Sequence, residues 1–201
     1  MKICIVGHGT SLSGKSYGTV IDEHDVVVRL KNCSSILGTP DYGSKATVQV
    51  ASVDTPGIIG SIRAEMYWIY TKAGKFDPAT VGEAVGKVQA PVWMPVDLAV
   101  HWNKHFVEIG GKHPCVSIGT AAFFMAAHFF QPEQITMAGF DTVMAGGGDG
   151  QSNRTKAVPR TGTGIIPHDW ATERKFLEVV ADTYQFNIAV LGSIEEHKPA
   201  A

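Results

Sequence analysis

Short apolar runs alternate along the chain with polar and glycine-rich stretches, and several of them are rich in β-branched or aromatic residues. Runs of this kind are typical of strands buried inside a sheet. The first, Ile3 to Val6, leads directly into a glycine-rich turn at Gly7. In all, the pattern predicts strands at residues 3–6, 26–30, 46–50, 67–70, 92–94, 135–140 and 187–191.

Longer segments have the character of helices. Residues 117–130 are apolar on nearly every side, with Ser117 placed to cap the start and Pro132 to stop the end, which predicts a buried helix. Residues 169–184 carry apolar positions at helical spacing with charges between them, which predicts an amphipathic helix. A further helix is expected at 98–108.

The composition is that of an ordinary globular enzyme. The 201 residues are 44% hydrophobic and 18% charged, which is enough apolar material for one large core. Because the predicted strands and helices interleave, we expect an α/β fold: a single Rossmann-like domain over residues 1–201, with a mostly parallel sheet flanked by helices. Residues 145–163 are rich in Gly, Ser, Thr and Asn and predict a long functional loop.

Charge and cysteine content narrow the class of protein. The formal net charge is -2, so the basic excess of a nucleic-acid binder is missing and we expect no nucleic-acid partner. The odd count of cysteines, at Cys4, Cys33 and Cys115, fits neither a disulfide framework nor a zinc site, and we expect thiols and no bound metal. No apolar run reaches membrane-spanning length. We therefore expect a cytoplasmic protein without a transmembrane segment.

A glycine-rich segment, Gly7–Ser16, follows the first predicted strand. Open α/β sheets bind ligands at the carboxyl ends of strands, and backbone amides in such turns hold phosphate. Within this segment, Gly9–Ser16 also matches the P-loop pattern. Two features argue against a P-loop. Gly18 interrupts the helix that would have to follow it, and the nearest Walker-B candidate, Asp141, comes after Gly139 and Phe140, which is not the usual end of a Walker-B strand. A tight turn without ligand, and a P-loop nucleotide-binding protein or kinase, stand as alternatives.

Three ordered blocks carry the most specific signal. In the first, residues 5–12, 21–30 and 42–47 read IVGHGTSL, IDEHDVVVRL and YGSKAT. In the second, Ser117-Ile118-Gly119 precedes the predicted buried helix, and the strand after it ends in Gly-Phe. The third is His168 to Glu173, a His-x4-Glu pattern ahead of the amphipathic helix. In this order the blocks resemble the large, small and very short sialylmotifs of the animal-type sialyltransferases, glycosyltransferase family 29, in a compact microbial or viral form.

The resemblance implies an inverting, metal-independent glycosyltransferase of variant GT-A type. It implies a CMP-linked sialic acid, or a related keto-acid sugar such as Kdo, as donor, a glycan or glycolipid as acceptor, and no cofactor. His168 is the expected general base, because the pKa of imidazole lies near neutrality, and Glu173 is expected to orient it or to tie the loop. The implied donor-binding residues are Gly7, His8, Gly9, Thr10, Ser11, Lys31, Asn32, Ser117, Ile118 and Gly119.

The sequence also departs from the family pattern. His8 stands where the family has an asparagine in the turn, and Lys31 aligns with the second asparagine, with Asn32 one place later. The motif that bears a phosphate-facing histidine falls near residues 149–153, where this chain has none. A catalytically inactive CMP-binding module of the same fold is therefore a further alternative.

Other polar residues have simpler interpretations. We expect His24 to belong to a structural turn and His128 to be a hydrogen-bonded core histidine. Lys45 either belongs to the site or pairs with a carboxylate such as Asp25. His101 and His105 lie one helical turn apart, which suits a metal, but no third ligand at matching spacing is evident.

Overall fold

The computed structural model describes residues 1–71, 78–111, 116–141 and 170–192. Its centre is a seven-stranded sheet in the order β5-β4-β3-β2-β1-β6-β7, and every strand pair is parallel. The strands are β1 (Lys2–Val6), β2 (Val26–Leu30), β3 (Val48–Ser52), β4 (Met66–Tyr70), β5 (Pro91–Trp93), β6 (Gln134–Ala138) and β7 (Asn187–Leu191). The expected fold class, a parallel sheet flanked by helices, is confirmed.

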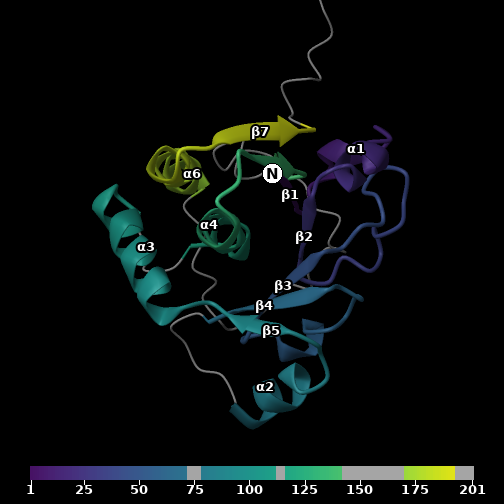
Figure 1. The fold of residues 1–201 in the computed structure, drawn as a ribbon, viewed down its shortest axis with the longest axis horizontal. Coiled ribbons are helices and arrows are strands. Elements are labelled where there is room, and N and C mark those ends of the chain that lie inside the picture. Colours follow the sequence, from purple (N-terminus) through teal and green to yellow (C-terminus); the bar gives the residue numbers. More distant parts are fainter. Residues whose placement is uncertain (72–77, 112–115, 142–169, 193–201) are drawn as a thin grey trace, which may run out of the picture.

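Helices cover both faces of this sheet. The helices and 3-10 turns are η1 (Thr10–Leu12), α1 (Gly18–Asp22), η2 (Pro56–Ile58), α2 (Pro78–Val85), α3 (Val96–Glu108), α4 (Ile118–Phe130) and α6 (Trp170–Tyr184). Figure 1 shows the sheet curving around α4, with α3 and α6 outside it on the same face and α1 and α2 on the opposite face. The largest core cluster lies between the sheet and α3, α4 and α6. No helix among the described residues is long and apolar enough to cross a membrane.

The helix α4 is the centre of this core. Its first ten residues, Ile118 to Ala127, are all buried, because the helix is enclosed between the sheet and α6. This confirms the predicted buried helix, and the side chain of Ser117 accepts a hydrogen bond from the Thr120 amide as its N-cap, at 3.2 Å. The buried core histidine predicted at position 128 is wrong. The last turn of α4 emerges into solvent, so His128 is exposed there, with Nδ1 3.2 Å from the hydroxyl of Tyr184.

The predicted elements agree closely with the structure. All seven strands are confirmed within two residues at their starts, and the helices predicted at 98–108, 117–130 and 169–184 correspond to α3, α4 and α6. Three short elements, η1, η2 and α1, and the eight-residue helix α2 were not predicted. The loop expected at 145–163 lies outside the described residues, and the extent of one domain over 1–201 stays a prediction.

Candidate functional site at the carboxyl edge of the sheet

The order of the strands gathers three predicted segments at one edge. Strands β2, β1 and β6 are neighbours and run parallel, so the segments that leave their carboxyl ends lie side by side. These segments are the glycine turn after β1, residues 31–32 after β2 and residues 139–141 after β6. In open α/β sheets this edge is where ligands bind.

The glycine turn packs tightly against the segment after β6. The Gly7 amide donates to the carbonyl of Ala138 at 2.8 Å, and the Gly9 amide donates to that of Gly139 at 2.8 Å. A Cβ on Gly7 would lie 2.5 Å from the Gly139 oxygen, and one on Gly9 would collide with the carboxylate of Asp141. These two glycines are therefore required by the close approach of two backbones, with or without a ligand on the turn.

Asp141 fastens the glycine turn. Its side chain is buried, and its carboxylate accepts a hydrogen bond from the Ser11 amide at 3.0 Å and another from the Ser11 hydroxyl. The sequence had offered this aspartate only as a poor Walker-B candidate. The structure instead makes it a side chain that fixes the conformation of a predicted donor-binding residue.

A second set of contacts holds the turn from the other side. The Tyr42 hydroxyl donates to the Gly9 carbonyl at 2.6 Å, and the guanidinium of Arg29 donates to the Tyr42 carbonyl at 2.7 Å. Arg29 is completely buried, and its Nε donates to the Lys45 carbonyl at 2.9 Å. Sequence reasoning assigned no role to Arg29 or Tyr42. The available signal was an arginine inside an otherwise apolar strand, which requires buried partners.

The Lys45 side chain is not paired with the carboxylate suggested for it. Its Nζ donates to the backbone carbonyl of His24, and the carboxylate of Asp25 accepts from the Lys2 amide at 2.7 Å. Both bonds hold the segment that enters β2, so Lys45 and Asp25 stabilise the turn through backbone groups.

The P-loop match does not have the structure of a P-loop. The amides of Gly14 and Ser16 both donate to the Asp41 carboxylate, at 2.7 and 2.9 Å. These hydrogen bonds hold the pKa of Asp41 below its usual value. A carboxylate therefore occupies the amides that would have to bind a phosphate, and the next helix begins only at Gly18. This arrangement argues against the P-loop alternative.

The segment after β2 carries two predicted donor-binding residues. His8 Nε2 lies 3.1 Å from the Asn32 carbonyl, and because a carbonyl only accepts, this nitrogen is the donor. Lys31 has a left-handed backbone with φ of 53°. Its carbonyl accepts from the buried side chain of Gln49 at 2.9 Å. The structure thus brings His8, Lys31 and Asn32 next to the glycine turn.

The amino end of α4 completes the edge. A Cβ on Gly119 would lie 2.6 Å from the ring of Phe140, and one on Gly7 would lie 3.3 Å from the same ring. Phe140 therefore separates the glycine turn from α4 at a fixed spacing. In the part of the chain that the structure describes, the amides of Ile118 and Gly119 contact no acceptor, as is usual for the first turn of a helix. The role in donor binding predicted for Ile118 and Gly119 stays a prediction.

Glu173 joins α6 to the same helix end. Its side chain is 1% exposed; one carboxylate oxygen accepts from the Ser117 amide at 3.0 Å, and the other accepts from the Thr120 hydroxyl. The helix dipole of α4 favours a negative charge at this point. Glu173 lies in the first turn of α6, five residues after His168, which is outside the described residues. The catalytic roles predicted for both stay predictions.

Residues 1–73 match the model of glycosyltransferase family 29 (sialyltransferase). This amino-terminal segment is therefore similar to the sialyltransferases. The matched segment contains β1 to β4 and the whole of the first block, so the resemblance seen in the sequence is confirmed.

Two solved sialyltransferases share the fold of this chain. A mammalian sialyltransferase in complex with Gal-β-1-3GalNAc-ortho-nitrophenol matches with a TM-score of 0.66 at 15% identity, over 96% of this chain and 69% of that one. A second mammalian sialyltransferase structure matches with a TM-score of 0.61 at 16% identity and the same coverage. No curated protein sequence matches the chain significantly. Together, the family match and the shared fold support a glycosyltransferase.

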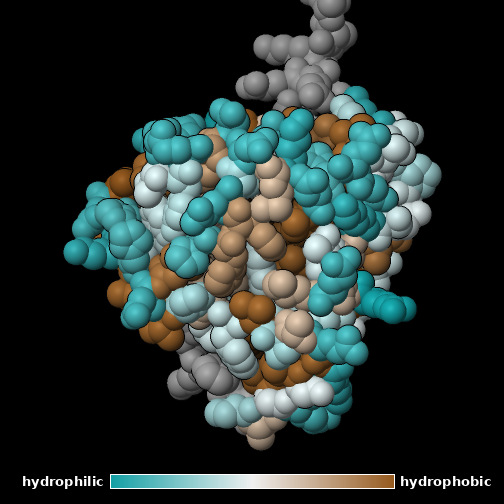
Figure 2. All heavy atoms as spheres, viewed as in Figure 1, coloured by the Kyte–Doolittle hydropathy of each residue, from teal (hydrophilic) through white to brown (hydrophobic). Residues whose placement is uncertain are grey.

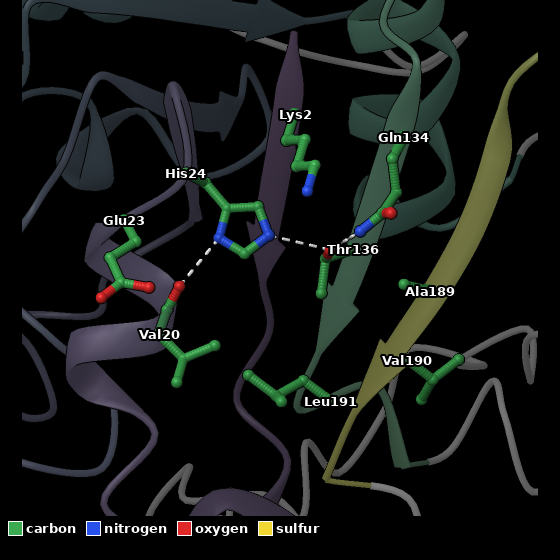
Figure 3. Close-up of a pocket in the computed structure, with 9 residues that line it drawn as sticks. All are labelled: Lys2, Val20, Glu23, His24, Gln134, Thr136, Ala189, Val190 and Leu191. Atoms are coloured by element: carbon green, nitrogen blue, oxygen red, sulfur yellow. Dashed lines mark hydrogen bonds between the residues drawn. The ribbon is translucent and has the colours of Figure 1, made fainter.

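The protein also has a cavity of about 380 Å³ on the sheet face that α1 partly covers. Figure 3 shows His24 in its wall, with Nε2 2.9 Å from the Thr136 hydroxyl and Nδ1 2.9 Å from the Val20 carbonyl. Lys2 and Gln134 also line it, and both begin their strands, so this cavity extends to the edge of the sheet opposite the glycine turn. His24 therefore belongs to a hydrogen-bonded turn, as predicted, and lies away from the predicted donor site.

The remaining histidine pair lies on α3. The rings of His101 and His105 are 4.6 Å apart between centroids, and His105 Nδ1 lies 3.0 Å from a carboxylate oxygen of Glu108. Among the described residues, no group of three or more His, Cys, Asp or Glu side chains is placed to hold a metal ion.

Proposed function

We propose that this protein transfers sialic acid, or a related keto-acid sugar, from a CMP-sugar to a hydroxyl group of a glycan or glycolipid. The observation that carries the proposal is the assembly at the carboxyl edge of the sheet. There the glycine turn and the amino end of α4 lie on either side of Phe140, each held by a buried carboxylate, Asp141 or Glu173. Such an edge suits a nucleotide with a single phosphate.

The donor would lie along this edge. Backbone amides of Ile118 and Gly119 supply hydrogen-bond donors and the positive end of the α4 dipole. His8 and Asn32 lie beside the glycine turn and are placed to contact the nucleotide. No metal is needed in this arrangement, because the leaving group is one phosphate and its charge is met by fixed dipoles.

The transfer would be a direct displacement with inversion. His168 takes the proton from the acceptor hydroxyl while the acceptor oxygen forms its bond to the anomeric carbon. The bond from that carbon to the phosphate oxygen of CMP breaks at the same time, and CMP leaves with its electron pair. Glu173 lies one turn into the following helix and ties the start of α6 to α4, which would hold the base segment beside the donor.

A cytoplasmic location is part of the proposal. It rests on the cysteines: Cys4 and Cys33 are free and buried thiols, as expected in a reducing compartment.

Ligand-dependent thermal stability is the first test. Binding of CMP to the folded state at a hundred times its dissociation constant adds about 2.7 kcal/mol, which raises the Tm by about 5–11 °C for a domain of this size. ATP with magnesium should give no rise, because Asp41 occupies the amides of Gly14 and Ser16. A rise with ATP that depends on Lys15 would restore the P-loop alternative.

Transfer itself is tested with CMP-sialic acid and CMP-Kdo as donors. Gal-β-1-3GalNAc is a suitable first acceptor, because it forms part of the compound bound in one of the structural neighbours. His168→Ala should lower the transfer rate about 10²–10⁴-fold, the usual contribution of a general base, with CMP binding unchanged. His128→Ala changes an exposed histidine of α4 and should keep full activity. If the protein binds CMP but neither transfers the sugar from any CMP-sugar nor hydrolyses the CMP-sugar, the result would favour the alternative of a catalytically inactive CMP-binding module.

A further inference from the structure

The helix α3 has two apolar faces. One is buried against α4 and α6 and is formed by Leu98, Trp102 and Phe106. The other is exposed to solvent and is formed by Val96, Val100 and Val107, with exposed fractions of 69%, 62% and 50%. The spacing of four and seven residues places these three valines in one line along the helix. We call this line the valine stripe.

The valine stripe lies on the outside of the molecule. Figure 1 shows α3 at the left edge of the fold, away from the sheet, and Figure 2 shows hydrophobic residues among hydrophilic ones along the same edge. Trp93, immediately before the helix, is 43% exposed and extends the apolar surface. Single exposed apolar residues are normal, but an ordered line of them on one helix indicates a contact surface.

The charges beside the stripe are mixed. Asp97 lies near the amino end of α3 and Lys104 near its carboxyl end, and both lie on the same side of the stripe. Lys104 is 76% exposed, and its nearest ionic contact, to Glu108, is 3.8 Å long. A helix that binds an anionic membrane carries an excess of Lys and Arg along its polar face. This helix does not, so a membrane is disfavoured as the occupant.

The stripe is complementary to itself in the antiparallel direction. If a two-fold axis crosses α3 midway between residues 101 and 102, Val96 of one copy lies level with Val107 of the other. At a rise of about 1.5 Å per residue, Asp97 of one copy then lies within about 3 Å, along the helix, of the level of Lys104 of the other. The pair forms twice, because a two-fold contact repeats every interaction. The two helix dipoles are also antiparallel, which is the favourable arrangement.

We propose that a second copy of this chain covers the valine stripe, through antiparallel packing of α3 against α3. The contact is one helix of 13 residues on each side, which is smaller than a standard stable interface. The dimer is therefore weak and reversible, and protein concentration controls its population. The inference stands independently of the proposed transferase activity.

Sedimentation velocity over a wide concentration range tests the dimer. The protein should shift from monomer to dimer as its concentration rises, and Val100→Glu should raise the dissociation constant at least about tenfold, the effect of 1.4 kcal/mol or more. Val20→Glu is the matched control, because Val20 is 43% exposed on α1, and it should leave association unchanged. Circular dichroism and urea unfolding verify that both variants fold.

Charge reversal tests the antiparallel register. Asp97→Lys alone places two cations opposite each other, and Lys104→Asp alone places two anions, so each variant should remain monomeric. An equimolar mixture of the two variants should associate again, because each Lys then meets an Asp in the heterodimer. A protein that is monomeric at every concentration, or variants that associate like the parent chain, would overturn the proposal. A third outcome would also overturn it: the parent chain stays monomeric and binds anionic lipid vesicles, and the Val100→Glu variant loses that binding.

Discussion

Single residues at the predicted donor edge are constrained by backbone geometry. Lys31 is one of five non-glycine residues with positive φ in the described part of the chain. A left-handed backbone costs an ordinary L-residue roughly 1–2 kcal/mol, and Gly, Asn and Asp tolerate it best. The asparagine that the sialylmotif pattern has at this position would tolerate this backbone better than a lysine does.

Substitutions at Lys31 test this constraint. Lys31→Gly and Lys31→Val both remove the amine, so a comparison between them isolates the backbone effect. We expect the glycine variant to be more stable than the valine variant by about 1–2 kcal/mol, because a β-branched residue is poorly accommodated at φ of 53°. Urea unfolding measures the difference. Equal stabilities would mean that the backbone at this position relaxes without cost.

Asp22 gives the fold a defined response to acid. Burial raises the pKa of its carboxyl group, but hydrogen bonds from the amides of Ser44 and Lys45, at 2.7 and 2.9 Å, outweigh this and leave the pKa below its usual value. A lowered folded pKa contributes stability that is present above the unfolded value and is lost as the pH falls through the folded one.

The matching experiment is urea unfolding of the parent chain and of Asp22→Asn as a function of pH. The variant should be less stable at neutral pH by about 1–2 kcal/mol, because charged acceptors form the stronger hydrogen bonds. The difference should begin to shrink below about pH 4, where the carboxyl group of the unfolded chain takes up its proton, and should shrink further as the pH falls through the lower pKa of the folded state. A difference that stays constant across this range would assign the effect to packing.

At the scale of elements, the strands were predictable and the contacts between elements were not. Most of the strands are apolar runs bounded by glycine or polar residues, and a local pattern is sufficient to find them. Helix α1 has only five residues, with Gly18 at its start, and offers too short a period to detect. The hydrogen bonds from Ser11 to Asp141 and from Ser117 to Glu173 join residues that lie 130 and 56 positions apart in the sequence. Only the folded arrangement of the strands and helices brings these residues together, so no local pattern could predict the bonds.

The link between α4 and α6 is tested by replacing Glu173. Glu173→Ala leaves the buried Ser117 amide and Thr120 hydroxyl without their acceptor, and it should lower the free energy of unfolding by about 2–4 kcal/mol. Glu178→Ala removes an exposed carboxylate from the same helix and should change it by less than about 0.5 kcal/mol.

The isosteric variant separates anchoring from chemistry. Glu173→Gln keeps an acceptor for the Ser117 amide, so it should lose less stability than the alanine variant and keep much of the transfer activity. If Glu173→Gln abolished transfer while its unfolding free energy matched that of the parent chain, the carboxylate would have a direct role in the reaction.

At the scale of the whole molecule, the interior strand β1 reports on global unfolding. Cys4 lies in β1, between β2 and β6 in the sheet, and is fully buried, and this burial raises its pKa to about 12. Cys33 is also buried, and its pKa is raised for the same reason. Neither thiol can react as a thiolate until the surrounding core opens.

Thiol labelling measures this protection. In a Cys115→Ser background, both remaining thiols should react with Ellman's reagent at least about a thousandfold more slowly in the native protein than in urea, in line with ordinary folding equilibria. The labelling rate should be higher in the Glu173→Ala variant, by the same factor by which the substitution raises the equilibrium constant for unfolding. Rapid labelling of the native protein would show that the sheet opens locally around β1.

The position of β1 has a consequence for biosynthesis. Strands β1 to β4 pair in the order in which they leave the ribosome, but the other side of β1 pairs with β6, whose first residue is Gln134. The nascent chain therefore exposes an apolar strand with an open edge for on the order of ten seconds at ordinary elongation rates. Such edges recruit other chains. High expression without a chaperone that shields the first half of the chain should lead to aggregation before the second half is made.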